Sequence, residues 1–136
     1  MELLLDTNIL LWALFDDDHL SKEFKNLISD EANDIYVSMA SLWEIEIKHC
    51  KNPTLMPYSI KDVFNVIMGG TDFILLGIKP EYLFNLNKEI YSGIHNDPFD
   101  HVLLATAAVE KVKLLTSDHI LKDYNNLGID VKINNH

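Results

Sequence analysis

Short apolar runs alternate along the chain with longer segments in which apolar residues recur every three or four positions. The short runs are apolar at every position, which is typical of parallel strands covered by helices on both faces. They predict strands over Glu2–Leu5, Ile35–Val37, Phe73–Leu76, Lys113–Thr116 and Asp130–Ile133. The three- and four-residue spacing predicts helices over Ile9–Phe15, Lys22–Asp30, Ala40–Cys50, Ile60–Met68, Glu81–Ile90, Pro98–Lys111 and Ile120–Asn125.

This alternation of strands and helices predicts an α/β fold, namely a three-layer α/β/α sandwich around a mostly parallel sheet of four or five strands. The stretches that break the pattern, such as Asn52-Pro53, Pro57 and Gly69-Gly70, have the length of ordinary loops. The sequence contains no internal repeat and no low-complexity tract. We therefore expect residues 1–136 to form a single domain.

Composition fits one compact domain, since 136 residues with 48% hydrophobic content suffice for one core. The first residues lack a basic segment, and every apolar run is far shorter than a bilayer span, so we expect neither a signal peptide nor a membrane helix. The single cysteine, Cys50, allows no internal disulfide and is expected to be a small buried side chain. These features predict a cytoplasmic protein.

The charge of the chain bears on the ligands that it can bind. The sequence has 21 acidic and 11 basic residues, which give a formal net charge of −10. Such a surface does not favour non-specific coating of DNA, which depends on clustered Lys and Arg. The sequence has no arginine, so phosphate contacts would come from lysines such as Lys22, Lys25, Lys48, Lys51, Lys111 and Lys113. The excess of acids instead favours a basic protein partner or a group of carboxylates around a cation.

Two acidic residues follow predicted strands directly. Asp6 follows "ELLL" and Asp118 follows "KLLTS", and parallel strands bring both to the same edge of the sheet. Hydroxyl and amide side chains accompany them and are suited to holding carboxylates in place: Thr7, Asn8, Thr116 and Ser117. The alternative for each acid alone is that it caps the helix that follows it.

A third acid, Glu44, lies in "SMASLWEIEIK" about one turn inside a predicted helix. It shares a helix face with Ala40, Trp43 and Ile47, where a carboxylate without a partner is costly. The alternative to a functional role is an ordinary ion pair with Lys48, four residues further along the same helix.

Two further acids begin the helix in "HNDPFDHVLLATAA". Asp97 precedes Pro98, which suits the first helical position, so Asp97 has a good structural explanation as a helix cap. Asp100 lies about one turn into this helix and is expected to project toward the crevice at the sheet edge.

Four stretches, "LLLDTNILLWAL", "VSMASLWEIEIK", "DPFDHVLLATAA" and "LLTSD", resemble the acidic motifs of the PIN-domain ribonucleases. The similarity is greatest to VapC-like toxins of type II toxin–antitoxin pairs, and it extends in family order from Leu3 to about Tyr124. One position departs from the pattern, because the residue after "DPFD" is commonly arginine in such sequences and here is His101.

The resemblance implies a PIN-like fold with a catalytic, metal-binding set of four acids: Asp6, Glu44, Asp100 and Asp118. Asp6 and Asp100 would be the most direct ligands. It also implies a set of side chains that position ligands or substrate: Thr7, Asn8, Asp97, Ser117 and Lys48. Carboxylate oxygens suit Mg²⁺ or Mn²⁺ rather than a soft metal.

The function this implies is an Mg²⁺-dependent endoribonuclease that acts as the toxin of a toxin–antitoxin pair. Its partners would be an RNA substrate, a cognate antitoxin protein and a second copy of the chain. Two alternatives stay open: a phosphoacceptor or phosphatase domain phosphorylated on Asp6, and a non-catalytic protein-interaction domain of PIN-like fold. The first normally has a second acid two residues after the nucleophile, where this chain has Asn8.

Aromatic and histidine side chains near the motifs have simpler interpretations than ligand binding. The aromatics are expected to be core or dimer contacts rather than stacking surfaces for bases: Trp12, Trp43, Phe64 and Phe99. The histidines have no metal-ligand spacing and are expected to be exposed or hydrogen-bonded: His49, His95, His101 and His119.

Overall fold

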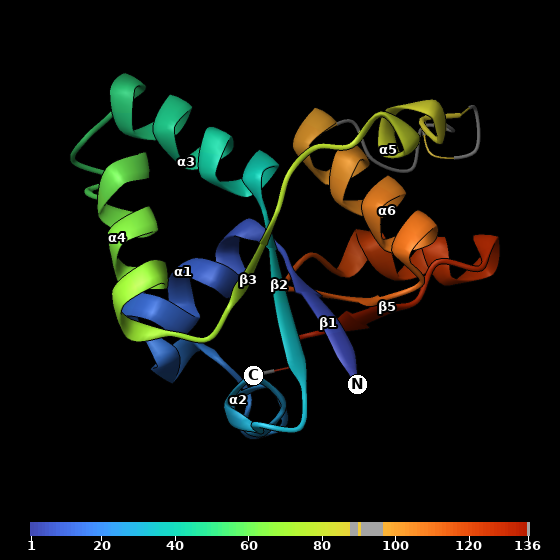
Figure 1. Cartoon of the computed structure of the whole chain (residues 1–136), viewed down its shortest axis with the longest axis horizontal. Coiled ribbons are helices and arrows are strands. Elements are labelled where there is room, and N and C mark those ends of the chain that lie inside the picture. The colour runs from blue at the N-terminus through green and yellow to red at the C-terminus, as the bar shows by residue number, and fades with distance from the viewer. Residues whose placement is uncertain (88–89, 91–96, 136) are drawn as a thin grey trace.

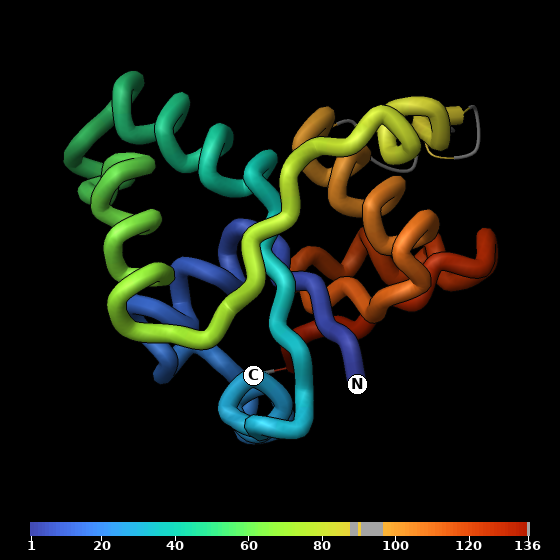
Figure 2. The backbone as a smooth tube through the Cα atoms, viewed as in Figure 1, coloured from blue at the N-terminus to red at the C-terminus, as the bar shows by residue number. Residues whose placement is uncertain are grey.

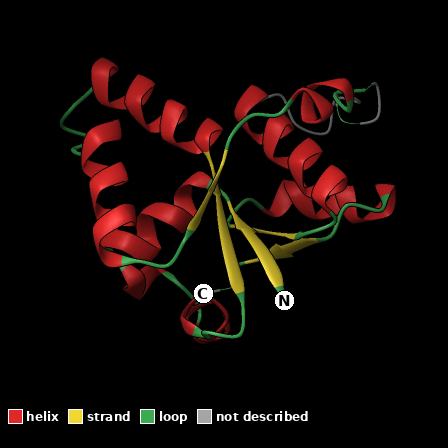
Figure 3. Ribbon diagram, viewed as in Figure 1, coloured by secondary structure: helices red, strands yellow, loops and turns green. Residues whose placement is uncertain are grey.

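The computed structural model describes residues 1–87, 90 and 97–135 of the chain. Five parallel strands form one sheet in the order β3-β2-β1-β4-β5, as the ribbon in Figure 3 shows. The strands are β1 (Glu2–Leu5), β2 (Asp34–Ser38), β3 (Ile74–Leu76), β4 (Lys113–Thr116) and β5 (Val131–Ile133). The predicted α/β fold with a parallel sheet is confirmed.

Helices cover both faces of this sheet (Figure 1). One layer contains α1 (Thr7–Phe15), α2 (Lys22–Ser29), α3 (Met39–Lys51) and α4 (Ile60–Gly70), with the short 3₁₀ helix η1 (Asp17–His19). The other contains α5 (Pro80–Phe84), α6 (Pro98–Glu110) and the 3₁₀ helix η2 (His119–Leu127). Strand β1 contributes to both cores, since Leu3 and Leu5 pack into the first and Leu4 into the second. This explains why its residues are apolar throughout.

The order of the strands creates a crevice beside β1. From β1 the chain builds β2 and β3 on one side through α1 to α4, and later adds β4 and β5 on the other side (Figure 2). The order in which strands are added to the sheet thus reverses between β1 and β4. At such a switch point, the loops at the carboxyl ends of the two strands diverge and leave space for a ligand. The backbone N–H of Asp6 donates to the Leu115 carbonyl at 2.9 Å, which fixes the end of β1 against β4.

Two helix predictions are wrong in extent or type. The helix expected over Glu81–Ile90 is α5, which ends at Phe84 because the Asn85 side chain donates to the Glu81 carbonyl at 2.8 Å and closes the turn. The helix expected over Ile120–Asn125 is η2, a 3₁₀ helix that Gly128 ends in the left-handed region.

Cys50 is exposed at the end of α3, so its predicted burial is also wrong. The helix simply carries this position outward, because its buried residues lie in the first half. His95 lies outside the described residues, so the expectation made for it is not addressed. No helix in the described residues is long and apolar enough to span a bilayer.

Candidate active site

A pocket of about 160 Å³ lies at the carboxyl ends of β1 and β4. Every side chain that lines it is polar: Asp6, Thr7, Asn8, Glu44, Lys48, Asp97, Asp100, Ser117 and Asp118. The structure thus brings together all four acids of the predicted catalytic set and all five of the predicted positioning residues. They come from α1, α3, α6 and the β4–η2 junction, which are far apart in the sequence.

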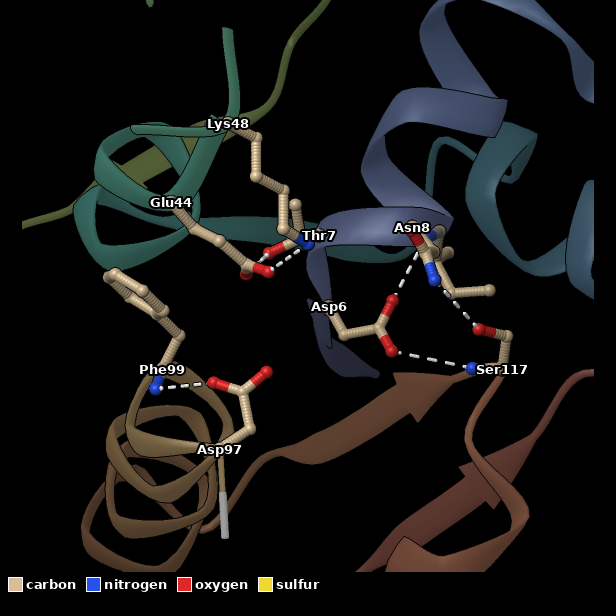
Figure 4. Close-up of polar contacts among 9 residues, drawn as sticks. Asp6, Thr7, Asn8, Glu44, Lys48, Asp97, Phe99 and Ser117 are labelled. Carbon is tan, nitrogen blue, oxygen red and sulfur yellow. Dashed lines mark hydrogen bonds and ion pairs between the residues drawn. The ribbon is translucent and has the colours of Figure 1, made fainter. Parts of the chain in front are cut away.

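Asp6 is one of two buried acids in the pocket, with 5% of its surface exposed. It caps α1, because its Oδ1 accepts from the Ile9 N–H at 2.8 Å. Its Oδ2 accepts from the Thr116 hydroxyl. The same oxygen accepts from the Ser117 N–H at 3.3 Å, as Figure 4 shows. Burial, with a smaller contribution from the nearby Glu44, raises the pKa of Asp6 to about 6 against the effect of these hydrogen bonds.

Glu44 joins two helices at the opposite wall of the pocket. Because β2 runs into α3 without a loop, with Ser38 as the cap, Glu44 lies in the second turn and is 5% exposed. Its Oε1 accepts from the Thr7 hydroxyl on α1 at 2.6 Å, and its Oε2 pairs with the Lys48 ammonium at 2.6 Å (Figure 4). The expected ion pair is therefore present, together with a link between α1 and α3.

Asp97 and Asp118 both cap helices. The Oδ1 of Asp97 accepts from the Phe99 N–H at 2.9 Å at the start of α6, and that of Asp118 accepts from the Ile120 N–H at 3.0 Å at the start of η2. The capping interpretation is thus correct for both and for Asp6. It does not compete with a functional one, since the pocket is lined by these same caps.

Asp100 and His101 are neighbours in α6 with different environments. Asp100 lines the pocket from the first turn, half-buried, and adds to burial in raising the pKa of Tyr124. His101 is 4% exposed and is not among the pocket residues. Similar sequences commonly carry arginine at this position. In this chain the side chain at this position, His101, does not line the pocket.

The donor chemistry of the pocket fits a hard divalent cation, since its acidic ligands are all carboxylates. Within the described part of the chain, however, no three His, Cys, Asp or Glu side chains are arranged around a common metal position. The reason is visible in Figure 4, where Glu44 is engaged by Thr7 and Lys48 and Asp97 is turned to a backbone N–H. A bound ion would require some of these side chains to reorient or to bind through water.

The sequence model of the PIN domain family matches residues 3–127. The chain belongs to the PIN domain family. Proteins with this domain are generally nucleases. No curated protein matches the sequence significantly.

Solved structures with the same fold as this PIN domain include three toxin–antitoxin complexes. VapBC2 from Rickettsia felis, bound to a promoter DNA fragment, superposes with a TM-score of 0.68 at 15% identity over 98% of both chains. DNA-bound VapBC from Salmonella typhimurium gives 0.64 at 16% identity, also over 98% of both chains. A toxin–antitoxin complex from Klebsiella pneumoniae gives 0.58 at 20% identity over 95% of both chains.

An aromatic pair at the rim of the PIN domain pocket was not expected from the sequence. The rings of Trp43 on α3 and Phe99 on α6 meet edge to face, with centroids 5.1 Å apart. Trp43 is 56% exposed, so the prediction of a core position is wrong for it, and a dimer contact stays a prediction. Its helical spacing to apolar neighbours gave no signal of this, because exposure depends on how α3 meets α6.

Proposed function

We propose that this PIN domain is a divalent-metal-dependent endoribonuclease that hydrolyses RNA phosphodiester bonds with Mg²⁺ or Mn²⁺. The observation that carries the proposal is the set of five carboxylates around one polar pocket at the point where the sheet reverses its building direction. The general nuclease activity of PIN domains supports the same reaction class.

Electrostatics favours a cation in this pocket. Two carboxylates about 4 Å apart repel by roughly 4 kcal/mol at an effective dielectric constant near 20, so a cluster of acids needs a cation or protons. At Asp6, burial is the main cause of the raised pKa and the nearby Glu44 adds a smaller contribution, since both disfavour the charged carboxylate. A divalent ion would offset the cost and leave Asp6 ionised.

Each side chain then has a definite task. A bound Mg²⁺ or Mn²⁺ would supply Lewis-acid chemistry and acidify its bound water. Asp6 and Asp100 would be the most direct ligands of the ion, and Glu44 and Asp118 would complete its oxygen ligands directly or through water. Thr7 and Lys48 orient Glu44, since each contacts one of its oxygens at 2.6 Å.

Two polar groups remain to receive a phosphate. The Asn8 amide lies 3.4 Å from the Ser117 hydroxyl beside Asp6, and both side chains line the pocket. These neutral donors can contact phosphate oxygens without adding to the negative charge. Water is the proposed nucleophile: its oxygen forms a bond to phosphorus while the bond from phosphorus to the leaving ribose oxygen breaks, and the proton that the water loses is balanced by the one that this ribose oxygen gains.

The phosphoacceptor alternative is disfavoured by the surroundings of Asp6. Both of its oxygens accept hydrogen bonds from Ile9, Thr116 and Ser117, and it is 5% exposed. A carboxylate oxygen that accepts a hydrogen bond can still bind a cation through its second lone pair, whereas an attacking oxygen also has to lie in line with a phosphoryl group. Loss of catalysis in a purely interacting domain would leave no reason to keep the mutually repelling acids together.

We also propose that the protein is the toxin of a toxin–antitoxin pair, cytoplasmic and homodimeric, and held inactive by a small antitoxin. The three structural neighbours are toxin–antitoxin complexes, although their low sequence identity supports only the fold. A basic antitoxin segment over the acidic pocket would complement the net charge of −10. Co-expression with a small protein encoded beside it should restore growth and yield a stable complex.

The test of the nuclease proposal is cleavage of RNA in Mg²⁺ and Mn²⁺ titrations by the full chain. Asp6→Asn and Asp100→Asn should each lower the metal-dependent rate by at least about 100-fold, in line with the loss of a main catalytic charge. The matched control is Asp123→Asn, which removes an exposed acid of η2 outside the pocket and should cleave like the wild type. Metal-dependent cleavage that survives both pocket substitutions would contradict the proposal.

In cells, the same variants identify the substrate. RNA ends sequenced after induction of the wild-type chain should show new cleavage sites that are absent with Asp6→Asn. A stable acyl phosphate on Asp6, or identical RNA ends in the two cultures, would support the alternatives instead.

A further inference from the structure

The polar pocket leaves the bases of a bound RNA without a binding surface. All of its lining residues are polar and five are acidic, which suits a phosphate with its counter-ions and not an aromatic base. Nearest in sequence to these acids are two aromatic rings. Trp43 directly precedes Glu44, and Phe99 directly precedes Asp100, so both rings come from the helical turns that supply the acids.

The two rings contact each other, and each belongs to a helical turn that also lines the pocket. They meet at an interplanar angle of 82° with centroids 5.1 Å apart, the edge-to-face geometry that aromatic pairs prefer. Figure 4 shows the Phe99 ring between the start of α6 and the helix that carries Glu44. Phe99 is half-buried, whereas Trp43 is 56% exposed. Phe99 thus braces the indole, and the indole presents its free surface to solvent.

Charge explains why such a surface is useful here. Lys48 is the one cation among the pocket-lining residues in the described part of the chain, and Glu44 already engages it. With no arginine and a net charge of −10, phosphate contacts give little affinity for RNA. Stacking on an aromatic ring does not depend on net charge and contributes to the binding of any unpaired base.

We propose that the Trp43 indole, braced by Phe99, is a stacking surface for an unpaired base next to the scissile phosphate. This inference rests on the nuclease function proposed above. It makes Trp43 a substrate-positioning residue and gives it no part in the chemistry.

Binding experiments can test the surface without cleavage. In an Asp100→Asn background with Mg²⁺ present, the probes are single-stranded oligoadenylate and an abasic ribose-phosphate oligomer of equal length. Trp43→Ala should weaken oligoadenylate binding by roughly 5- to 100-fold, the effect of losing one stacked base. It should leave binding of the abasic oligomer unchanged, since that probe has the same charge but no base.

Matched variants show whether a loss of RNA affinity comes from lost stacking, from lost apolar volume or from impaired folding. Trp43→Phe keeps an aromatic ring and should retain most of the affinity, whereas Trp43→Leu keeps only bulk and should behave like Trp43→Ala. Phe84→Ala removes an aromatic that is 81% exposed on α5 and lies outside the pocket lining, so it should bind like the background protein. In a Trp12→Phe variant, which leaves Trp43 as the single tryptophan, oligoadenylate should quench the fluorescence and the abasic oligomer should not.

The outcomes distinguish this inference from the nuclease proposal. If the wild type cleaves RNA but Trp43→Ala binds and cleaves with unchanged KM, the stacking surface is wrong and the nuclease stands. If oligoadenylate binds with the expected Trp43 dependence but no metal supports cleavage, the nuclease proposal fails and the surface stands. A Trp43→Ala variant that loses its dimer while binding RNA normally assigns the ring to a protein interface and overturns the inference.

Discussion

The Asp6 carboxylate is the cap of α1 and, in the proposed mechanism, also a metal ligand. As the cap of α1 it accepts a hydrogen bond from the Ile9 N–H in the first turn of the helix. Its second oxygen accepts from Thr116 and Ser117 and so links the end of β1 to the end of β4. Helix capping alone needs no burial, because exposed caps function equally well. The burial that raises its pKa to about 6 is therefore a cost that capping does not explain and that a bound cation would remove.

This cost predicts an inverted pH dependence at Asp6. A carboxyl with a folded-state pKa near 6 and an unfolded value near 3.8 binds more protons when folded, so the free energy of unfolding falls as pH rises between these values. The fall amounts to about 3 kcal/mol. Asp6→Asn removes the titrating group and should therefore remove this fall. From pH 4 to pH 7 the free energy of unfolding of the variant should thus rise relative to that of the wild type.

Urea unfolding with EDTA present measures this difference across the pH range. Asp123→Asn is the control and should follow the wild-type pH profile. Parallel profiles for wild type and Asp6→Asn would show that Asp6 titrates normally in the folded protein.

The Thr7 hydroxyl allows a second test at the residue scale. It donates to the buried Glu44 at 2.6 Å, and Thr7→Val has nearly the same shape without a donor. We expect Thr7→Val to lower the free energy of unfolding by about 1 to 3 kcal/mol, because a buried carboxylate loses a hydrogen bond. Thr7→Ser retains the hydroxyl and should lose less than half as much in the same denaturant measurement; equal losses would assign the effect to packing.

At the scale of elements, three helices begin at the pocket with an acidic cap: α1 at Asp6, α6 at Asp97 and η2 at Asp118. Only one residue separates β1 from α1 and two separate β4 from η2, so these two caps are fixed at the sheet edge. The predicted start of α6 at Pro98 is correct, and those of α1 and η2 are within two residues of the observed ones, because capping is local chemistry. It was less accurate for α5 and η2, whose extent and type depend on the Asn85 side chain, on Gly128 and on packing against α6.

The far end of α6 gives a prediction independent of function. The helix ends at Lys111 in the left-handed region, with φ 55° and ψ 46°, a conformation that costs a non-glycine residue roughly 1 kcal/mol. Lys111→Gly should therefore raise the free energy of unfolding by about 1 kcal/mol. Lys111→Ala keeps the Cβ and should give no such gain when both are compared by urea unfolding, and RNA cleavage should be unchanged in each.

The whole molecule is acidic, yet its proposed substrate is a polyanion. Attraction over the full surface is therefore absent, and affinity has to come from the pocket, its cation and the Trp43 ring. Basic nucleic-acid-binding proteins differ, because release of counter-ions from many phosphate contacts makes their affinity fall steeply with salt.

The salt dependence of RNA binding should consequently be shallow. Lys48 is the one lysine among the described pocket-lining residues, so at most one phosphate contact to a lysine is expected there. We expect the logarithm of the binding constant to fall with the logarithm of KCl concentration with a slope of about −0.7 at constant Mg²⁺. Lys48→Met should reduce the magnitude of this slope by about 0.7. Lys22→Met, on an exposed position of α2, should leave it unchanged; a steep wild-type slope would point to an extended lysine-rich RNA path.

The sequence by itself determined the order of the elements, the parallel sheet and the arrival of Asp6 and Asp118 at one edge. Each of these follows from local periodicity and from the position of a residue directly after a strand. Tertiary structure decided which strands are neighbours, and with that the burial of Asp6, the contact of Glu44 with Thr7 and the exposure of Trp43. These features depend on packing between segments remote in the chain, where the spacing of residues along the sequence carries no information about distance.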